Sequence, residues 1–550
     1  MYKVVQFTCL IGLVASLHAS IISPRASGPA VTIQSGTFKG NSSGVIDAFY
    51  GIPYAAPPLG PLRFKPPTPL TRNFPDFDAT RQPPACTQHG NPAGKLTKML
   101  PIKVPEVTGQ EDCLTLDIIR PSGVKKGDKL PVFFWIFAGG FTFGFSTQNK
   151  GDNLVKKSVE MKKPMIFVAI NHRLNMFGFL GGKEIAAEGS GNLGLLDQRM
   201  ALEWVQANIA EFGGDPTQVT IGGASSGGMS VVYQMMANGG NHKNLFRGVI
   251  SESGSPISAG RLADGSGQSV YDTIVKDSGC AGTPNTLECL RSADYTKLTT
   301  AMAKMPESVP GYPFILTFFP RIDDKFLTSS MEDALSSGKV AKVSIISGAE
   351  DDEGTGFGIL LGTKLNLPDD LSNKLKHLMP AMTAPQLDKL LTLYHSDDVT
   401  QGSPFNTGYF NVLSPFYKQF SAIMGDVVFQ APRRLLTRST QAVMPSYGYI
   451  DRGSKSLPYL GSAHASELTA VFGQMPGPRT NDFQSRWISF VNALDPNSAG
   501  LPRWERYGSG GGQVLEFKDL GSSGTIPDDF RADGTNFVIE NMKALRIIAP

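Results

Sequence analysis

The chain is poor in several kinds of residue that indicate function. Its 550 residues carry a net charge of only +3, which gives no indication of a nucleic acid or an acidic membrane surface as a partner. No stretch beyond the N-terminus offers ~20 uninterrupted apolar residues, so no membrane-spanning helix is expected. No repeat of fixed period and no long low-complexity tract is present. Because the usual domain has about 100–150 residues, the chain holds either several domains or one large α/β domain with insertions.

The N-terminus has the pattern of a secretory signal peptide. Lys3 supplies the positive flank, residues 4–17 are mostly apolar, and Ala19 and Ser20 provide a small-residue cleavage site. The alternative is an ordinary N-terminal strand or anchor. We predict a signal peptide over residues 1–20, a secreted protein, and a single catalytic domain over residues 21–550.

Cysteine is scarce, and its number is informative. Cys9 lies in the predicted signal peptide, which leaves Cys86, Cys113, Cys280 and Cys289. An even number in a secreted chain favours two disulfides, for which three connectivities are possible. No group of Cys and His has the spacing of zinc ligands, so we predict neither a metal nor another cofactor.

The pattern Gly-x-Ser-x-Gly occurs twice, and its context separates the two sites. Around Ser42, polar residues lie between two strand-like runs and no helix follows, which is typical of a hairpin or loop turn. Asn41 beside it opens a sequon and is a predicted glycosylation site. Around Ser225, the strand-like residues 218–221 precede a helical pattern instead.

That helical pattern predicts a nucleophile elbow at Ser225. Apolar residues recur at positions i, i+3, i+4 and i+7, which are Met229, Val232, Tyr233 and Met236. A strand, a sharp turn and a helix expose the serine hydroxyl at the carboxyl end of the strand. Ser226 has Ala224 instead of Gly two positions before it, so Ser225 is the predicted nucleophile. The alternative is a Gly-rich turn without catalytic function.

A second Gly-rich segment predicts the donors of an oxyanion hole. Residues 131–137 are continuously apolar, as a strand buried on both faces would be, and they lead into Gly139 and Gly140. Glycines let backbone N–H groups approach a carbonyl oxygen closely. Together with the amide of Ser226, they are predicted to bind an oxyanion. The alternative is a Gly-rich turn after a core strand.

A serine nucleophile also needs a base and an acid that orients it. Of seven histidines, His464 lies in a loop rich in Gly, Ser and Ala, late in the chain, which matches the order serine, acid, histidine. A structural histidine is the alternative. For the acid, the strand-like residues 343–347 precede a loop from Gly348 with acidic residues at 350–353. We expect three of these acids to be solvated and Glu353, which precedes an apolar run, to turn inward.

Four long segments in one order carry a resemblance to a known family. They are FYGIPYAAPPLGPLRFKPP at 49–67, EDCLTLDI at 111–118, NHRLNMFGFL at 171–180 and GNLGLLDQRMALEWVQANIAEFGGDPTQVTI at 191–221. GDVVFQAPRR and FVNALDPN follow towards the C-terminus. Over nearly the whole mature chain the sequence resembles the type-B carboxylesterase/lipase family, the cholinesterase-like branch of the α/β-hydrolases. The short second disulfide loop looks like that of secreted fungal lipases and sterol esterases.

The resemblance implies a fold and a set of site residues. The fold is α/β, an α/β-hydrolase with a mixed, mainly parallel sheet and helices on both faces. The implied site is a triad of Ser225, Glu353 and His464 with an oxyanion hole of Gly139, Gly140 and the amide of Ser226. The implied disulfides are Cys86–Cys113 and Cys280–Cys289. Ser253 is expected near the triad, and Arg63–Glu111 and Arg173–Asp197 are expected structural ion pairs.

The sequence departs from the family pattern at four positions. Ala224 and Ser226 replace the usual Glu and Ala around the nucleophile, Ala138 replaces a frequent third glycine, and His172 replaces a usual tyrosine. Because residue 226 contributes its backbone amide, neither change beside the nucleophile is expected to abolish catalysis.

The predicted reaction is hydrolysis of carboxylic esters with an apolar acyl chain, through an acyl-enzyme. Residues 95–107 mix apolar side chains with lysines inside the loop between Cys86 and Cys113. They form either a lid that opens at a lipid–water interface or a packed surface loop. The apolar runs at 311–320 and 356–362 line an acyl pocket or belong to the core. The alternatives are an esterase for short, soluble esters and, disfavoured because all three triad positions are filled, a non-catalytic binding protein.

Overall fold

The computed structural model describes residues 28–89, 107, 109–257, 260–306, 316–361, 365–394, 405, 413–509, 511–519 and 521–545. The predicted signal peptide and most of the predicted lid, residues 95–106, lie outside the described residues.

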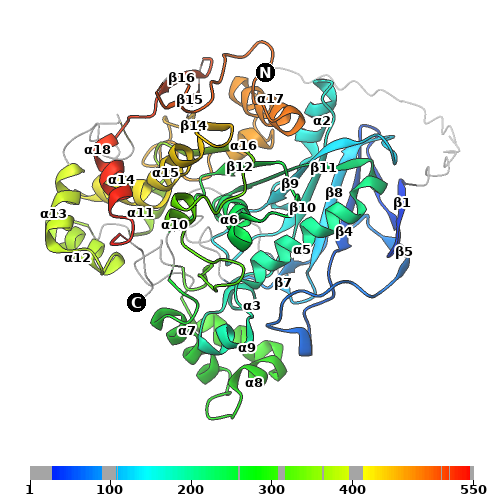
Figure 1. The fold of residues 1–550 in the computed structure, drawn as a ribbon, viewed down its shortest axis with the longest axis horizontal. Helices are drawn as coiled ribbons and strands as arrows, with labels where there is room; N and C mark the ends of the chain where they lie inside the picture. The colour runs from blue at the N-terminus through cyan, green and yellow to red at the C-terminus, as the bar shows by residue number, and fades with distance from the viewer. Residues whose placement is uncertain are drawn as a thin grey trace, which may run out of the picture.

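An eleven-stranded mixed sheet forms the centre of the molecule (Figure 1). In spatial order its strands are β16 (Gly524–Pro527), β15 (Gln513–Lys518), β14 (Ser446–Arg452), β13 (Ser344–Glu350), β12 (Gly248–Glu252), β11 (Gly214–Ala224), β9 (Leu130–Ile136), β10 (Ile166–Ile170), β8 (Thr115–Pro121), β4 (Ile46–Pro53) and β3 (Asn41–Ser42). The strands from β15 to β10 are parallel, and antiparallel strands flank them at both ends. This is the mixed, mainly parallel sheet that we predicted.

Two small sheets accompany the large one. They consist of β1 (Ala30–Ile33), β2 (Gly36–Lys39) and β5 (Phe74–Asp78), and of β6 (Ala85–Cys86) and β7 (Gly109–Gln110). Ser42 lies in β3, which pairs antiparallel with β4, so the segment around it is a hairpin as predicted.

The described helices surround the large sheet. They are α2 (Asp152–Glu160), α3 (Asn175–Phe179), α4 (Lys183–Glu188), α5 (Leu193–Asn208), α6 (Ser226–Gly240), α7 (Gly265–Asp277), α8 (Thr286–Ser292), α9 (Tyr295–Lys304), α10 (Met331–Ser336), α11 (Thr355–Leu361), α12 (Pro368–Leu378), α13 (Ala384–Leu393), α14 (Tyr417–Gly425), α15 (Ala431–Thr440), α16 (Leu468–Val471), α17 (Pro478–Ala493) and α18 (Ala532–Glu540). Short 3₁₀ turns are η1 (Gly60–Leu62), η2 (Ser146–Gln148) and η3 (Ile209–Phe212), and η5 (Asp426–Gln430) is a π-helical turn. In the described part of the chain no helix combines the length and the apolar character needed to cross a membrane.

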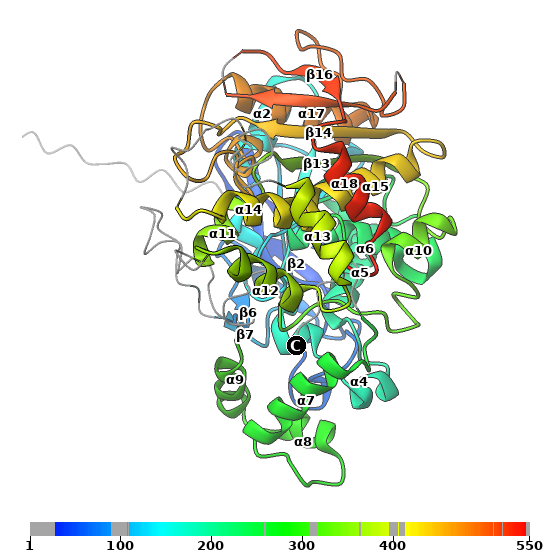
Figure 2. The same cartoon turned by 90° about the vertical axis from the view of Figure 1, so that its left-hand side faces the viewer.

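Side chains of β9 show why helices cover both faces of the sheet. Successive side chains of a strand point to opposite faces. Phe133 and Trp135 enter the core that α2 and α17 close, and Phe134 and Ile136 enter the core of α5 and α6. Figure 2 shows α2 and α17 on one side of β13 and β14, with α6 and α15 on the other. A strand that is apolar on both faces therefore requires both helical layers.

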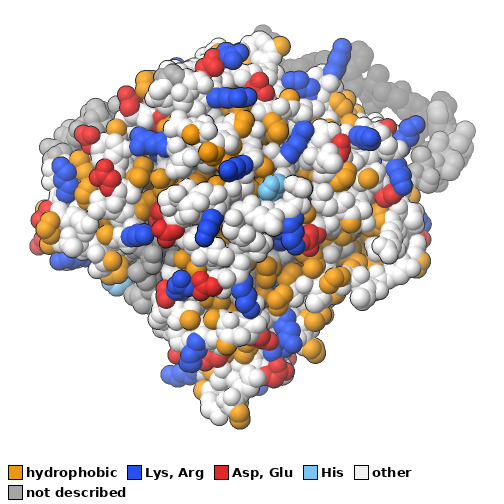
Figure 3. All heavy atoms as spheres, in the orientation of Figure 1, with side chains coloured by type: hydrophobic (Ala, Val, Ile, Leu, Met, Phe, Trp, Pro, Cys, Tyr) orange, Lys and Arg blue, Asp and Glu red, His pale blue; other side chains and the backbone are white. Residues whose placement is uncertain are grey.

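The surface carries charges of both signs. Figure 3 shows Lys and Arg interspersed with Asp and Glu over the visible face, with no large area of one sign. This distribution agrees with the small net charge of the chain.

Candidate active site

The segment around Ser225 is a sharp turn between a strand and a helix. β11 ends at Ala224 and α6 begins at Ser226, so the turn is a single residue long. Ser225 has φ 55° and ψ −122°, a backbone conformation that costs a non-glycine residue on the order of 1–3 kcal/mol. Its amide donates to the carbonyl of Glu252 at 2.9 Å, and its carbonyl accepts from the amide of Met229 at 2.8 Å. These bonds hold the strained turn.

Both glycines of Gly-x-Ser-x-Gly are required by contacts. A Cβ atom at Gly223 would lie 2.5 Å from the carbonyl of Gly227. A Cβ atom at Gly227 would lie 2.1 Å from the carbonyl oxygen of Ile136, at the end of β9. The turn therefore closes only without side chains at these positions, whereas the buried Ala224 is accommodated in the core.

The structure brings Ser225, His464 and Glu353 together in one hydrogen-bonded line. His464 Nε2 lies 2.9 Å from Ser225 Oγ, and His464 Nδ1 lies 2.6 Å from Glu353 Oε2. The three residues follow β11, β13 and β14, which are parallel strands, so their loops meet at one edge of the sheet. The Glu353 side chain is 1% exposed and the His464 side chain 14%, so the imidazole lies between a buried acid and an accessible hydroxyl.

The electrostatics of this line favour a charged imidazole. Burial disfavours the charged form of His464, but the charge and hydrogen bond of Glu353, with a contribution from Glu467, outweigh it. The pKa of His464 is therefore raised above its ordinary value. A histidine in this environment accepts a proton from Ser225 readily.

The acidic run at 350–353 differs from our expectation. We expected three of these acids to be solvated, which is wrong: all four side chains are buried. The strand β13 also extends to Glu350, so the loop begins three residues later than Gly348. Only Glu353 reaches His464.

Partners from distant segments explain this burial. Asp351 pairs with Arg452 and Arg531, and Asp352 pairs with Lys455. These cations lower the pKa of Asp351, although burial alone would raise it. The local pattern of acids contains no sign of partners about 100 to 180 residues away.

The segment that leads to Gly139 and Gly140 contacts this turn, because a Cβ atom at Gly227 would lie 2.7 Å from the carbonyl oxygen of Phe137. Gly139 has φ 146°, and a Cβ atom there would lie 2.0 Å from the carbonyl oxygen of Phe143. Gly140 has φ 60°. Ser226 is the first residue of α6, where backbone N–H groups have no partner within the helix. Among the described residues, none accepts a hydrogen bond from the amides of Gly139, Gly140 or Ser226.

Comparison with known proteins decides the family. The sequence matches the Carboxylesterase family over residues 27–533. This chain belongs to the carboxylesterase family. It is 39% identical to the secreted triacylglycerol lipase LIP1 of Gibberella zeae over 547 aligned residues. The alignment covers 95% of this chain and 92% of that protein. It is 38% identical to Lipase 4 of Diutina rugosa, over 96% of this chain and 98% of that protein.

A solved structure agrees with this assignment. The structure of Aspergillus niger EstA matches with a TM-score of 0.81 and 26% identity, over 95% of this chain and 99% of that one. The carboxylesterase therefore has the α/β-hydrolase fold, and it is a carboxylic ester hydrolase.

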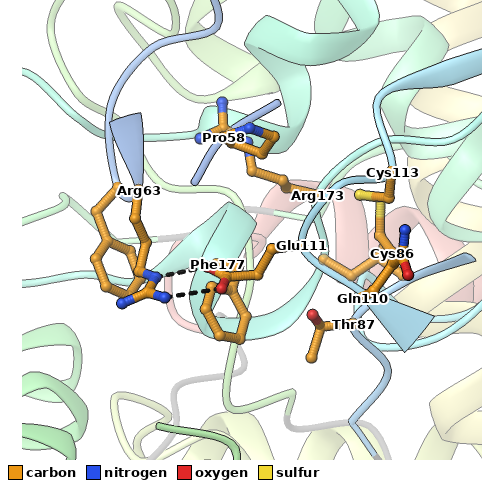
Figure 4. A pocket seen from close by; sticks show the side chains of 11 residues that line it. Pro58, Arg63, Cys86, Thr87, Gln110, Glu111, Cys113, Arg173 and Phe177 are labelled. Carbon is orange, nitrogen blue, oxygen red and sulfur yellow. Dashed lines mark hydrogen bonds and ion pairs between the residues drawn. A yellow bond between two sulfur atoms is a disulfide. The ribbon is translucent and has the colours of Figure 1, made fainter. Parts of the chain in front are cut away.

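Both disulfides implied by the resemblance form in this carboxylesterase. They join Cys86 to Cys113 and Cys280 to Cys289. Figure 4 shows that the first disulfide and the ion pair of Arg63 and Glu111 line the same pocket. In the ion pair, Arg63 Nε lies 2.5 Å from Glu111 Oε1. This pair fixes the base of the loop between Cys86 and Cys113.

The other expected structural contacts of the carboxylesterase also form. Two nitrogens of the Arg173 guanidinium group donate to the carboxylate of Asp197, and both side chains are buried. Ser253 follows Glu252, whose carbonyl accepts from the amide of Ser225, and its own amide donates to the carbonyl of Gly348 at 2.9 Å. His172 stacks on Phe137 outside the hydrogen-bonded line, and burial lowers its pKa to about 4.

Two aromatic side chains lie beside the catalytic histidine candidate, and only one of them belongs to a segment that we expected near the site. The ring of Phe429 lies 4.6 Å from that of His464, and Phe357 lies 5.4 Å away. Phe429 belongs to η5, a π-helical turn. A π-helical turn shifts the side chains by one position relative to an α-helix. The periodicity of the sequence therefore did not show that Phe429 faces the site, although Phe357 lies in the apolar run at 356–362.

Proposed function

We propose that this carboxylesterase hydrolyses esters of apolar acyl chains by transferring the acyl group to Ser225. The observation that carries the proposal is the hydrogen-bonded line from Ser225 Oγ through His464 to Glu353. A nucleophile, a base and an orienting acid in this order activate a hydroxyl that is otherwise a poor nucleophile.

The proposed mechanism assigns one role to each group. His464 Nε2 takes the proton of Ser225 as the oxygen attacks the ester carbonyl, and Glu353 stabilises the imidazolium. The amides of Gly139, Gly140 and Ser226 bind the oxyanion of the tetrahedral intermediate. His464 then protonates the leaving alcohol, and water hydrolyses the acyl-enzyme by the same steps.

Apolar groups around the reacting atoms support an apolar acyl chain. Phe357 and Phe429 stack beside His464. The side chain of Leu316 lies 3.4 Å from the position of a Cβ atom at Gly140. A relative with 39% identity is named a triacylglycerol lipase, which supports triacylglycerols as substrates.

A second candidate is hydrolysis of short, soluble esters. One solved structure with this fold is named a PNB esterase and not a lipase, which keeps an esterase as the second candidate. The lid prediction does not decide between the two, because residues 95–106 lie outside the described residues. The filled triad positions disfavour a non-catalytic binding protein.

We also propose that the protein is secreted after removal of residues 1–20, leaving one catalytic domain over residues 21–550. Two relatives are named secreted lipases. The two disulfides fit an oxidising compartment. Asn41 is exposed, as a glycosylated side chain must be.

The test compares hydrolysis of an emulsified long-chain ester and a soluble short-chain ester. Ser225→Ala is expected to lower kcat on both by roughly 10⁴-fold or more. Ser42→Ala, in the other Gly-x-Ser-x-Gly pattern, is the matched control and is expected to keep full activity. A preference of the wild type for the emulsion supports the lipase, and a preference for the soluble ester supports the esterase. Full activity of Ser225→Ala would refute the nucleophile.

A further inference from the structure

The loop of residues 138–144, here called the oxyanion loop, carries both glycines of the proposed oxyanion hole and is closed on itself. The carbonyl of Gly139 accepts from the amide of Phe143 at 3.2 Å, so the chain turns back directly after the glycine. At the end of the turn, a Cβ atom at Gly144 would lie 2.7 Å from the carbonyl oxygen of Ala138. Gly144 therefore packs against the residue that precedes Gly139.

One side chain binds both backbone groups of Gly144. The amide of Gly144 donates to Gln88 Oε1 at 2.7 Å, and Gln88 Nε2 donates to the carbonyl of Gly144 at 3.1 Å. The same nitrogen donates to the carbonyl of Cys86 at 2.6 Å. A glutamine side chain has two donor hydrogens on its nitrogen and an acceptor oxygen. Only this orientation of the Gln88 amide satisfies all three contacts, because the oxygen has nothing to donate to the two carbonyls.

Further contacts hold the same two segments together. The amide of His89 donates to the carbonyl of Thr142 at 2.9 Å. Asn175, the first residue of α3, donates from its side chain to the carbonyl of Thr87 at 2.6 Å and from its amide to the carbonyl of Phe141 at 2.7 Å. The segment that follows the first cysteine of the first disulfide therefore lies along the oxyanion loop.

The oxyanion loop needs such contacts because its own residues do not fix its shape. Gly139 and Gly144 have φ of 146° and 121°, and glycine adopts these conformations without preferring them over others. A donor of an oxyanion hole stabilises the transition state only when it is aimed at the oxygen that gains charge. A displacement of about 1 Å can lower the rate by about 10²-fold. A contact that fixes one end of the loop therefore affects the reaction.

We propose that Gln88 is a positioning residue for the oxyanion hole. Its side-chain amide holds Gly144 and thereby fixes the loop that aims the amides of Gly139 and Gly140 at the substrate carbonyl. The inference rests on the proposed function of Ser225 and of these amides. Because Gln88 acts through the loop and not on the ester itself, its loss weakens binding of the transition state and leaves binding of the ester unchanged.

The test replaces Gln88 by methionine, which has a similar size and no hydrogen-bond donor. We expect kcat and kcat/KM on a soluble ester to fall equally, by about 10- to 100-fold, because the lost interactions act only in the transition state. Gln206→Met is the matched control. Gln206, on α5, likewise donates to two backbone carbonyls, those of Pro216 and Leu245, and its replacement is expected to leave kcat unchanged.

An aryl trifluoromethyl ketone provides a readout that a merely structural role would not change. Ser225 Oγ forms a bond to the ketone carbon, the serine proton passes to His464, and the carbonyl oxygen becomes an oxyanion in the proposed hole. The inhibition constant of the ketone is expected to rise by the same factor by which kcat falls. Thermal melting checks folding. If Gln88→Met does not fold, Gln88→Glu replaces it: the carboxylate still accepts from Gly144 but no longer donates to its carbonyl, so kcat falls in the same direction.

Three results would overturn the inference: a wild-type kcat for Gln88→Met, a loss confined to KM, or a reduced kcat with unchanged affinity for the ketone. An equal loss in Gln206→Met would overturn it as well. Ser225→Ala separates the two proposals. An active Ser225→Ala refutes the proposed function itself, whereas an inactive Ser225→Ala together with a fully active Gln88→Met refutes only the role of Gln88.

Discussion

At the scale of single residues, the site depends on a strained turn that its neighbours hold in place. Ser225 has a positive φ without the freedom of glycine. The contacts that impose this conformation come from three strands, because β9, β11 and β12 all approach the turn. Glycine at 223 and 227 is therefore a condition for the geometry of the serine hydroxyl and not a source of flexibility.

Gly227→Ala tests this condition. The added methyl group would meet the carbonyl oxygen of Ile136 at 2.1 Å, so the helix start must move away from β9. We expect a loss of kcat/KM of about 10²-fold from misplacement of Ser225, with about 1–3 kcal/mol of destabilisation from overpacking. Gly265→Ala, where nothing lies within 4 Å of the added atom, is the control. Equal activities of the two variants in an ester assay would contradict this account.

The charge of Glu353 predicts a pH dependence. His464 must be neutral to accept the proton of Ser225, and its pKa is raised above 6.5 because Glu353 outweighs burial. Activity is therefore lost as pH falls, with the midpoint of kcat/KM above 6.5. Glu353→Gln is expected to lower this midpoint and to lower kcat by roughly 10⁴-fold. A variant with an unchanged midpoint on a soluble ester would show that Glu353 is not the partner of His464.

Sequence patterns predict the parts of the site that depend on local contacts. The elbow at Ser225 is a strand followed at once by a helix, and both periodicities lie within about twenty residues of the serine. The burial of Asp351 and Asp352 depends on cations from remote segments, and we predicted it wrongly. The resemblance supported the choice of Glu353 as the acid. The local sequence alone does not show which of the four adjacent acids contacts the histidine.

At the scale of elements, α15 is attached to the sheet through buried charges. Arg433 and Arg434 both bind the carboxylate of Asp528, and all three side chains are almost completely buried. α15 follows η5 without interruption, so this anchor also fixes the π-helical turn that carries Phe429. The buried ion pairs of Asp528, although remote from the site, therefore help to hold the side chain of Phe429 beside His464.

Asp528→Asn is expected to destabilise the protein strongly. Removal of one partner of a buried ion pair leaves uncompensated charge and costs about 3–5 kcal/mol. The two arginines lower the pKa of Asp528 despite its burial, so its contribution to stability is complete above the unfolded-state pKa and is lost as pH falls towards the folded-state pKa. Urea unfolding at neutral pH measures the first effect. Asp529→Asn at the neighbouring exposed position is the control, and equal midpoints for the two variants would contradict the anchor.

At the scale of the whole molecule, the parallel strands bring three loops far apart in the chain to one edge of the sheet. Ser225 and His464 are separated by 239 residues, yet their side chains lie 2.9 Å apart. The family resemblance implied a triad of Ser225, Glu353 and His464, and the three side chains lie in one hydrogen-bonded line. The π-helical turn carries no periodic signal, so it became visible only in three dimensions.

The two disulfides are expected to contribute unequally to the stability of the whole molecule. Cys86 and Cys113 are separated by 27 positions, and Cys280 and Cys289 by 9. A longer closed loop removes more entropy from the unfolded chain, which gives about 3.6 kcal/mol for the first bridge and about 2.7 kcal/mol for the second. Urea unfolding of the paired Cys→Ser variants, each with the other bridge intact, measures the difference. If the variant without Cys280–Cys289 unfolds at the lower urea concentration, strain in the native state and not chain entropy controls the contribution of the bridges.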